Sequence, residues 1–110
     1  MANADMQKGS AEMIVLALLE VRPRHGYELA KLIEAQSDNR LQFHVASLYP
    51  MLYRMERKKL VEGKWVEKAG ERRRRFYKLT AVGRAALAEQ RRSWRDFVEA
   101  LNQLTGFENA

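Results

Sequence analysis

The chain has 110 residues, which suits one domain whose core can fold without covalent or metal staples. It contains no cysteine, so disulfides, thiolate metal sites and cysteine nucleophiles are excluded, and an apolar content of 46% argues against a disordered chain. The net charge of +6 and the pI near 9.9 predict a polyanionic partner, although a basic surface can also serve solubility alone.

Two helices are predicted in the first third of the chain. Residues 1–7 lack periodicity and are expected to form a flexible tail. The first helix is predicted to begin at Ser10, as its N-cap, and to stop before Pro23. The second helix is predicted over 26–36 and is followed by the turn residues 37–39.

The second predicted helix also offers candidate contacts. Tyr27 and Lys31 lie four positions apart, so they share a face that could touch the DNA backbone. His25 precedes this helix, and a lone histidine in such a place is more often a structural hydrogen-bonding residue than a ligand. We therefore interpret His25 as structural and the face of Tyr27 and Lys31 as a candidate DNA contact.

A third helix is predicted over 46–57. Leu48, Leu52 and Met55 fall on one face at about 3.6 residues per turn, which predicts a buried side. The outward side carries hydroxyl, aromatic and guanidinium groups, which a helix needs to read bases in a DNA major groove. An ordinary amphipathic surface helix would show the same alternation. The outward residues are Ser47, Tyr49, Tyr53, Arg54 and Arg57, of which the first four are the candidate base or phosphate contacts.

The order of these helices is that of a helix-turn-helix. The short piece 41–43 is predicted to be extended and leads into the third helix, which would be the DNA-reading helix of the pair. Pro50 is an irregularity, because a proline inside a helix removes one backbone hydrogen bond and kinks the helix.

A basic hairpin is predicted after the third helix. Residues 60–67 and 72–79 have strand composition, and a glycine-containing turn at 68–71 lies between them. Such a hairpin after a helix-turn-helix is a wing, suited to gripping the DNA backbone or the minor groove. A run of four arginines is often only a solvated charge run, but this run lies on a strand-like segment between aromatic residues. The candidate wing contacts are Arg72, Arg73, Arg74 and Arg75.

A long last helix is predicted from its N-cap Thr80 to about residue 104. Two series of positions, each with a spacing of seven and offset by three, form an a/d seam of the coiled-coil kind. At about 1.5 Å per residue the helix would reach roughly 37 Å, longer than so small a domain buries alone. A second copy of the chain is the natural partner, and the alternative is a helix that folds back on its own domain. The predicted interface residues are Leu87, Trp94, Phe97, Val98, Leu101 and Leu104.

Several short motifs follow one another at characteristic spacing. They are His25-Gly26-Tyr27-Glu28-Leu29, Ser47-Leu48-Tyr49-Pro50, Leu52, Arg54-Met55-Glu56, Leu60-Val61, Trp65, Gly70, Arg74-Arg75-Phe76-Tyr77-Lys78-Leu79-Thr80 and Gly83-Arg84. With these motifs the chain resembles a PadR-family transcriptional regulator of the short kind with a single C-terminal helix, over about residues 8–98. A proline is expected in the recognition helix of this family, so the resemblance accounts for Pro50.

The chain departs from the family pattern at two places. The family often opens its recognition helix with serine, an acidic residue and glycine, where this chain has His44, Val45 and Ala46. His44 is expected to be a poorer N-cap than serine. At the wing tip the family commonly shows Gly-Gly-Arg-Pro-Arg-Arg, whereas residues 70–75 read Gly-Glu-Arg-Arg-Arg-Arg, so the tip should turn less sharply and be more basic.

The resemblance implies a fold class and a function. The expected fold is α+β and mostly helical, with a winged helix-turn-helix domain over 8–79, a C-terminal dimerisation helix over 80–106 and a tail over 107–110. Relatives of this kind are homodimeric repressors that bind inverted repeats in DNA. In them the first and last helices make the dimer, and a flat aromatic effector can sit between two tryptophans at its centre. Trp94 matches that tryptophan.

Two other classes of function compete with this one. A winged-helix module could bind an acidic protein through the wing arginines and have only non-specific affinity for nucleic acid. An enzyme is disfavoured, because the chain has 2 histidines, no phosphate-binding glycine loop and no metal-ligand cluster, so no catalytic residue, metal or cofactor is expected. With no apolar run near 18 residues and no signal peptide, we expect a cytoplasmic protein without a membrane partner.

Overall fold

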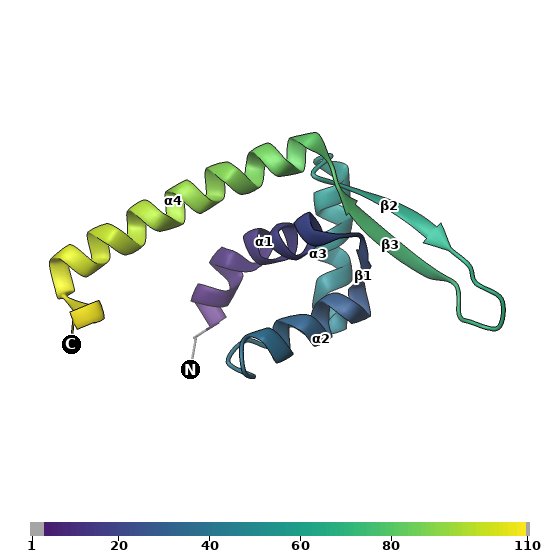
Figure 1. Ribbon diagram of the computed structural model, residues 1–110, viewed down its shortest axis with the longest axis horizontal. Helices are drawn as coiled ribbons and strands as arrows, with labels where there is room; N and C mark the ends of the chain where they lie inside the picture. The colour runs from purple at the N-terminus through teal and green to yellow at the C-terminus, as the bar shows by residue number, and fades with distance from the viewer. Residues whose placement is uncertain (1–3, 110) are drawn as a thin grey trace.

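Residues 4–109 are described by a computed structural model, in which an antiparallel sheet with the strand order β1-β3-β2 lies beside four α-helices (Figure 1). This confirms the predicted α+β, mostly helical fold class. Within these residues, no helix is long and apolar enough to cross a membrane. The elements are α1 (Ala4–Val21), β1 (Arg24–His25), α2 (Gly26–Gln36), α3 (Val45–Arg57), β2 (Val61–Val66), β3 (Arg74–Leu79), α4 (Ala81–Thr105) and the 3-10 helix η1 (Phe107–Asn109).

One hydrophobic core joins the helices to the sheet. The three apolar residues predicted to face inward from α3 are all buried, so the predicted period of this helix is confirmed. Fully burying a leucine is worth roughly 1.5–3 kcal/mol, which makes this face a principal contribution to the stability of the domain. The core consists of Val15, Leu16, Leu19, Leu29, Ala30, Leu48, Leu52, Met55, Leu60, Val61, Tyr77, Leu79 and Leu87.

Helix α3 runs without interruption through Pro50. Because proline has no N–H, the carbonyl of Ala46 loses its usual helical donor, but Pro50 is exposed and its ring lies on the outer side of the helix. His44 is the N-cap residue, and its side chain makes no capping hydrogen bond. The start of α3 therefore depends on packing more than on a cap, as expected for a histidine in place of serine.

Gly83 lets the first turn of α4 lie directly against the start of the hairpin. A Cβ atom at this position would lie 2.1 Å from the carbonyl oxygen of Leu60, which is a backbone atom and cannot rotate away. Thr80 completes the junction, since its hydroxyl accepts a hydrogen bond from the N–H of Gly83 at 3.0 Å and donates toward the carbonyls of Lys59 and Leu60 in the turn between α3 and β2. The predicted N-cap is confirmed.

The beginning of the chain was predicted wrongly. Helix α1 begins at Ala4, so residues 4–7 are helical rather than a tail and Ser10 lies inside the helix rather than at its N-cap. Residues 4–8 contain no proline or glycine, and extending an existing helix adds one hydrogen bond for each residue fixed. The remainder of the predicted tail, residues 1–3, lies outside the described residues.

Two further expectations need correction, and one strand was missed. The predicted tail at 107–110 contains η1 over its described part, and Asn102 accepts a hydrogen bond from the N–H of Glu108 at 3.0 Å through its side-chain oxygen. The short strand β1 was not predicted, because two residues carry no periodic signal and their pairing with β3 is a tertiary event. Arg72 and Arg73 lie in the loop before β3 rather than in the strand.

Helix α4 is divided between two environments. Its first half folds back on α1: Leu87 is 1% exposed in the chain's own core, and Gln90 donates to Glu12 of α1 at 2.8 Å. Leu87 is therefore not available to a second chain, because its surface is already buried, and its prediction as an interface residue is wrong. The second half, in yellow, extends beyond the end of α1 (Figure 1). There Leu104 is 86% exposed.

Candidate nucleic-acid interface

The outward side of α3 presents the predicted polar and aromatic groups to solvent. Ser47, Tyr49, Tyr53 and Arg54 are all exposed. At about 100° per residue, the two tyrosines lie on one flank of this side, and Ser47 and Arg54, two turns apart, lie on the other. Arg57 lies between the flanks with its guanidinium 5.9 Å from the ring of Tyr53. Arg57 is thus at the centre of the exposed side, although the sequence alone did not select it as a contact.

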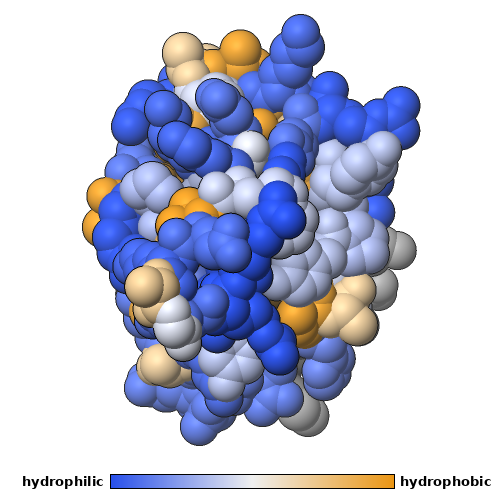
Figure 2. Space-filling view, turned by 90° about the vertical axis from the view of Figure 1, so that its right-hand side faces the viewer, coloured by the Kyte–Doolittle hydropathy of each residue, from blue (hydrophilic) through white to orange (hydrophobic). Residues whose placement is uncertain are grey.

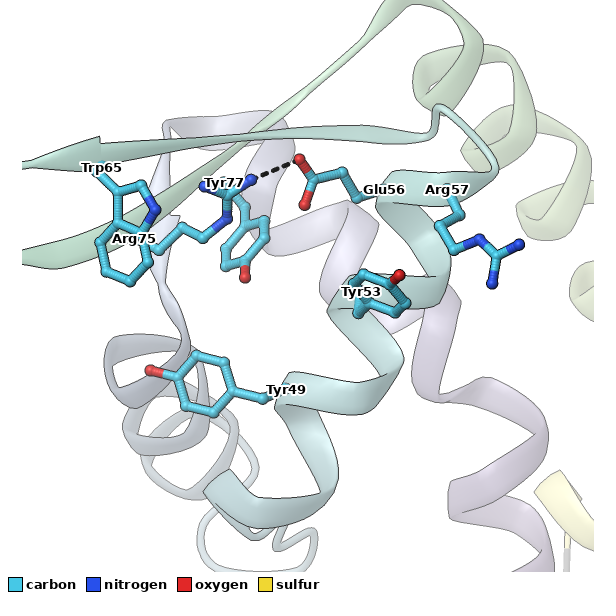
Figure 3. A pocket seen from close by; sticks show the side chains of 7 residues that line it. All are labelled: Tyr49, Tyr53, Glu56, Arg57, Trp65, Arg75 and Tyr77. Carbon is cyan, nitrogen blue, oxygen red and sulfur yellow. Dashed lines mark hydrogen bonds and ion pairs between the residues drawn. The ribbon is translucent and has the colours of Figure 1, made fainter.

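An open groove separates α3 from the hairpin (Figure 3). Its volume is about 610 Å³. The rings of Tyr49 and Tyr53 project into it from α3, opposite side chains from both strands of the hairpin (Figure 3). Helix and hairpin therefore share one concave surface, on which a nucleic-acid strand could be contacted from two sides. The lining residues are Tyr49, Tyr53, Glu56, Arg57, Trp65, Arg75 and Tyr77.

The position of Tyr49 depends on a glycine at the start of α2. A Cβ atom on Gly26 would lie 2.8 Å from Cζ of the Tyr49 ring and 3.1 Å from its hydroxyl oxygen. The ring is therefore held close against the N-terminus of α2 by a contact that any larger residue would obstruct. This contact orients one flank of α3 with respect to the helix before it.

The four wing arginines have different surroundings. Arg72, Arg73 and Arg74 are exposed, and among the described residues no carboxylate pairs with them. Arg73 stacks over the ring of Trp65 with its guanidinium carbon 4.6 Å from the ring centroid. Arg75 is partly buried and forms an ion pair with Glu56 of α3 at 2.6 Å. The first three arginines keep their charge available to an anion, whereas the charge of Arg75 is already compensated.

The predicted face of α2 lies beside the wing. The ammonium of Lys31 is 5.5 Å from the centroid of the Tyr27 ring, and the guanidinium carbon of Arg74 lies 5.9 Å from the same ring. Tyr27 is half exposed, so one aromatic ring is flanked by cations from two elements. The structure thereby brings the predicted contact pair of α2, Tyr27 and Lys31, next to the predicted wing contact Arg74, which is distant in the sequence.

His25 has the structural role that was predicted for it. Its Nδ1 accepts a hydrogen bond from the backbone N–H of Glu28 at 3.1 Å and so caps α2, and its ring packs edge-on against Phe76 at 5.1 Å. The guanidinium of Arg74 is 3.4 Å from both ring nitrogens. Burial lowers the pKa of His25 from its ordinary value of 6.5, and the nearby charge of Arg74 lowers it further.

Arg24 and Glu28 form a structural cluster that sequence reasoning missed. Arg24 is 7% exposed, and its guanidinium donates to the carbonyl of Leu18 at 3.0 Å and to the carboxylate of Glu28 at 2.9 Å. A buried arginine must be paired. Through these two contacts Arg24 of β1 ties the last turn of α1 to α2. The spacing of four between the two residues was a usable signal, but it does not indicate burial.

Seen from the hairpin end, the molecule is largely hydrophilic, with only scattered hydrophobic residues (Figure 2). This is the character expected of a surface that meets a polyanion rather than of an apolar protein interface.

A helix-turn-helix followed by a basic hairpin defines a winged-helix DNA-binding protein. Residues 15–89 match the Transcriptional regulator PadR-like family. The chain therefore belongs to the PadR family, whose members are transcription regulators and not enzymes. It is a DNA-binding transcriptional regulator.

Solved structures agree with this assignment. The chain is 33% identical to a PadR-like transcription factor from Bacteroides fragilis, with a TM-score of 0.75 and coverage of 93% of this chain and 96% of that one. It is 29% identical to a PadR-like transcriptional regulator from Bacillus cereus, with a TM-score of 0.79 and coverage of 92% and 96%. A transcriptional regulator from Clostridium thermocellum shares the fold at a TM-score of 0.88 and 23% identity, over 96% and 99% of the two chains.

The surroundings of His25 predict a loss of stability in acid. Because its folded pKa is below 6.5, the unfolded chain binds a proton more readily, so the free energy of unfolding should fall as the pH drops from about 6.5 through the folded pKa. Urea denaturation at about pH 7.5 and about pH 5.5 measures this loss. His25→Asn keeps a capping oxygen but cannot titrate, and it should lose less stability over the same interval. Equal losses in both proteins would assign the effect to another group.

Proposed function

We propose that this regulator is a homodimeric repressor that binds an inverted repeat upstream of the genes it controls. The observation that carries the proposal is that the exposed polar face of α3 lies across the groove from a hairpin with three exposed arginines that have no carboxylate partner among the described residues. One of these, Arg73, stacks on Trp65, which lines the groove. A helix of this composition suits a major groove, and a basic hairpin beside it suits the flanking backbone. Tyr27 and Lys31 would extend the backbone contact from α2.

The roles of the contact residues follow from their chemistry. Arg54 is exposed without a carboxylate partner among the described residues, so it can donate two hydrogen bonds to O6 and N7 of a guanine. Ser47, on the same flank, can donate to a phosphate or accept from a base. Tyr49 and Tyr53 can contact a sugar or a thymine methyl group and donate their hydroxyl hydrogens to phosphates. Arg72, Arg73 and Arg74 would contact the backbone without reading sequence.

The second half of α4 supports the dimer. Phe97 is 57% exposed, and Leu101, Leu104 and Phe107 are exposed along the same stretch of the chain. Leaving so much apolar surface in water is unfavourable, whereas a second α4 packed against it would bury these groups at the a/d spacing of a coiled coil. Val98 is partly buried and borders the same surface. Trp94, also partly buried, would begin the interface, since Leu87 belongs to the core.

A two-fold axis between the α4 helices would relate two recognition helices. Each would then read one half-site, and the half-sites would lie in successive major grooves roughly 10 base pairs apart or at a multiple of that distance. The symmetry of such a dimer is the physical reason to expect an inverted repeat.

Trp94 further supports an effector site at the dimer centre. Its ring packs edge-on against Phe97 with centroids 5.9 Å apart and approaches Gly9 of α1. Two such tryptophans across a two-fold axis would offer flat apolar faces to a small planar aromatic molecule. The molecule would release the repressor from DNA only if it bound the DNA-free geometry of the dimer more tightly.

Replacing Arg54 tests the assignment of α3 as the recognition helix. Arg54→Ala should weaken binding to the preferred operator by about 1–3 kcal/mol and relax the choice of base, because the paired hydrogen bonds to one guanine can no longer form. Gel-shift titration against the upstream DNA, with unrelated duplex as competitor, measures both effects. Arg92→Ala, which removes an equal charge from a surface of α4 where Arg92 pairs with Glu89, is the control.

Two outcomes of this titration would contradict the proposal. If Arg54→Ala selects its operator as well as the unmodified protein does, the recognition helix has been assigned wrongly. If unrelated duplex abolishes all binding by the unmodified protein, the charge binds DNA but does not read it, and the protein-interaction module becomes the better description.

Replacing Leu101 tests the dimer. Leu101→Glu places a carboxylate in the proposed seam and should shift the protein toward monomers in sedimentation velocity, because burying an unpaired charge is costly. Gln103→Glu adds the same charge on the opposite side of α4 and should leave the dimer intact. A stable dimer in both variants would show that the interface lies elsewhere.

Fluorescence of Trp94 tests the effector site. In a Trp65→Phe background, where Trp94 is the remaining tryptophan, planar aromatic compounds should quench the emission and lower the affinity for the operator together. A non-planar apolar compound of similar size is the control. A panel of planar aromatics that leaves the emission unchanged would remove the support for this site.

A further inference from the structure

We propose that Glu56, Arg75 and Gly63 form a latch that fixes the wing against the recognition helix, so that Arg75 is a positioning residue rather than a phosphate contact. The inference deepens the proposed function, because it rests on α3 reading bases while the wing grips the backbone. It also separates Arg75 from the three arginines that precede it.

The first part of the latch is a hydrogen-bonded ion pair. Nη2 of Arg75 donates to Oε2 of Glu56 at 2.6 Å (Figure 3). The same oxygen accepts a hydrogen bond from the backbone N–H of Gly63 at 3.3 Å. One carboxylate oxygen on the last turns of α3 is thus bound to both strands of the hairpin. The side chains of Arg75 and Glu56 are 27% and 29% exposed, so solvent screens the pair only partly.

The second part is the absence of a side chain on β2. A Cβ atom on Gly63 would lie 2.6 Å from both Nε and Nη2 of Arg75, so the guanidinium lies directly over the backbone of Gly63. The backbone of Gly63 is not in a conformation reserved for glycine, since its φ is not among the positive values. A glycine is needed at position 63 because a side chain there would occupy the volume that the guanidinium of Arg75 fills.

Two aromatic rings flank the guanidinium. Its carbon lies 5.7 Å from the centroid of Trp65 and 5.8 Å from that of Tyr77. Tyr77 is only 4% exposed, so its ring is a rigid wall. Arg75 is therefore held by a carboxylate, a backbone surface and two rings at once, a degree of confinement that a phosphate-binding side chain on a wing does not need.

The charge of Glu56 gives the same conclusion. A carboxylate that lines a DNA-facing groove would repel phosphates unless a cation compensated it. Arg75 supplies that compensation within the chain, and a phosphate could take over the guanidinium only by leaving Glu56 unpaired in the groove. The arrangement favours an Arg75 that stays on Glu56 when DNA binds.

The latch would act through the geometry of the groove. With the hairpin fixed to the end of α3, the wing can contact the DNA backbone only in the position in which the helix also contacts its preferred bases. Releasing the hairpin would leave the wing charge in place but let it bind the backbone independently of the bases. Specificity should therefore fall more than general affinity for DNA.

The test compares Arg75→Gln with Arg74→Gln, which removes the same charge one residue away from a side chain without a carboxylate partner. For each protein, binding to operator and to unrelated duplex is measured across a series of salt concentrations. Arg74→Gln should lower the slope of log affinity against log salt by about 0.9 for each phosphate that is no longer neutralised and leave the ratio of specific to unrelated binding unchanged. Arg75→Gln should leave the slope unchanged and lower the ratio by between about 2-fold and 150-fold.

Two more variants reach the latch by other routes. Gly63→Ala keeps every charge and should lower the specificity ratio without changing the salt slope, because its Cβ displaces the guanidinium. Glu56→Gln leaves Arg75 uncompensated and should lower the ratio while raising affinity for unrelated duplex. The double variant Glu56→Gln with Arg75→Gln should lose no more specificity than Arg75→Gln alone. Both single substitutions remove the same ion pair, so the second adds no further loss.

The outcomes separate the latch from the proposed function. If Arg75→Gln lowers the salt slope as Arg74→Gln does and keeps the specificity ratio, Arg75 is a phosphate contact and the latch is wrong, while the repressor stands. If the unmodified protein has no operator preference, the proposed function fails. The latch is then tested by a double-mutant cycle in urea denaturation, where additive losses for Glu56→Gln and Arg75→Gln would refute it. The same denaturation curves establish that each variant folds.

Discussion

Everything in this domain depends on the burial of one face of α3. Leu48, Leu52 and Met55 anchor the helix in the core that α1, α2 and the sheet share. Because a helix has two sides, fixing the inner side determines which residues the outer side offers to solvent. Ser47, Tyr49, Tyr53 and Arg54 are exposed for this reason. The packing of the core therefore also determines which residues form the candidate DNA-reading surface.

The arginines of this domain fall into two groups: some form ion pairs within the chain, and others keep their charge exposed to solvent. Arg24 and Arg75 are held by carboxylates: Arg24, which is buried, pairs with Glu28 of the neighbouring α2, and the partly buried Arg75 of β3 pairs with Glu56 of α3. Arg72, Arg73 and Arg74 keep their charge exposed on the hairpin. An arginine paired with a carboxylate adds nothing to the net charge of +6, so that excess is carried by unpaired cations, among them the exposed wing arginines.

Helix α4 links the DNA-binding domain to the proposed dimer interface. Its first turns are fixed to the domain by Gly83 and Leu87, so any partner bound to its far end is held in a defined relation to the recognition helix. Its second half carries exposed apolar groups that the domain itself does not cover. In the proposed dimer, a small change at the packing of Trp94 would alter the distance between two recognition helices, which links effector binding to DNA release by geometry alone.

The sequence by itself determined the fold class, because hydrophobic periodicity and caps are local signals. The bounds of α2, the buried face of α3, the cap at Thr80 and the hairpin were all readable in this way, and the motif order indicated the PadR family, which the family match then confirmed. Only the tertiary structure decided which groups are available. Leu87 reads as part of the α4 seam yet lies in the core, and Arg75 reads as one of four wing arginines yet is held by Glu56, because burial and pairing depend on residues distant in the chain. The strand β1 appeared for the same reason, since two residues become a strand only when β3 lies beside them.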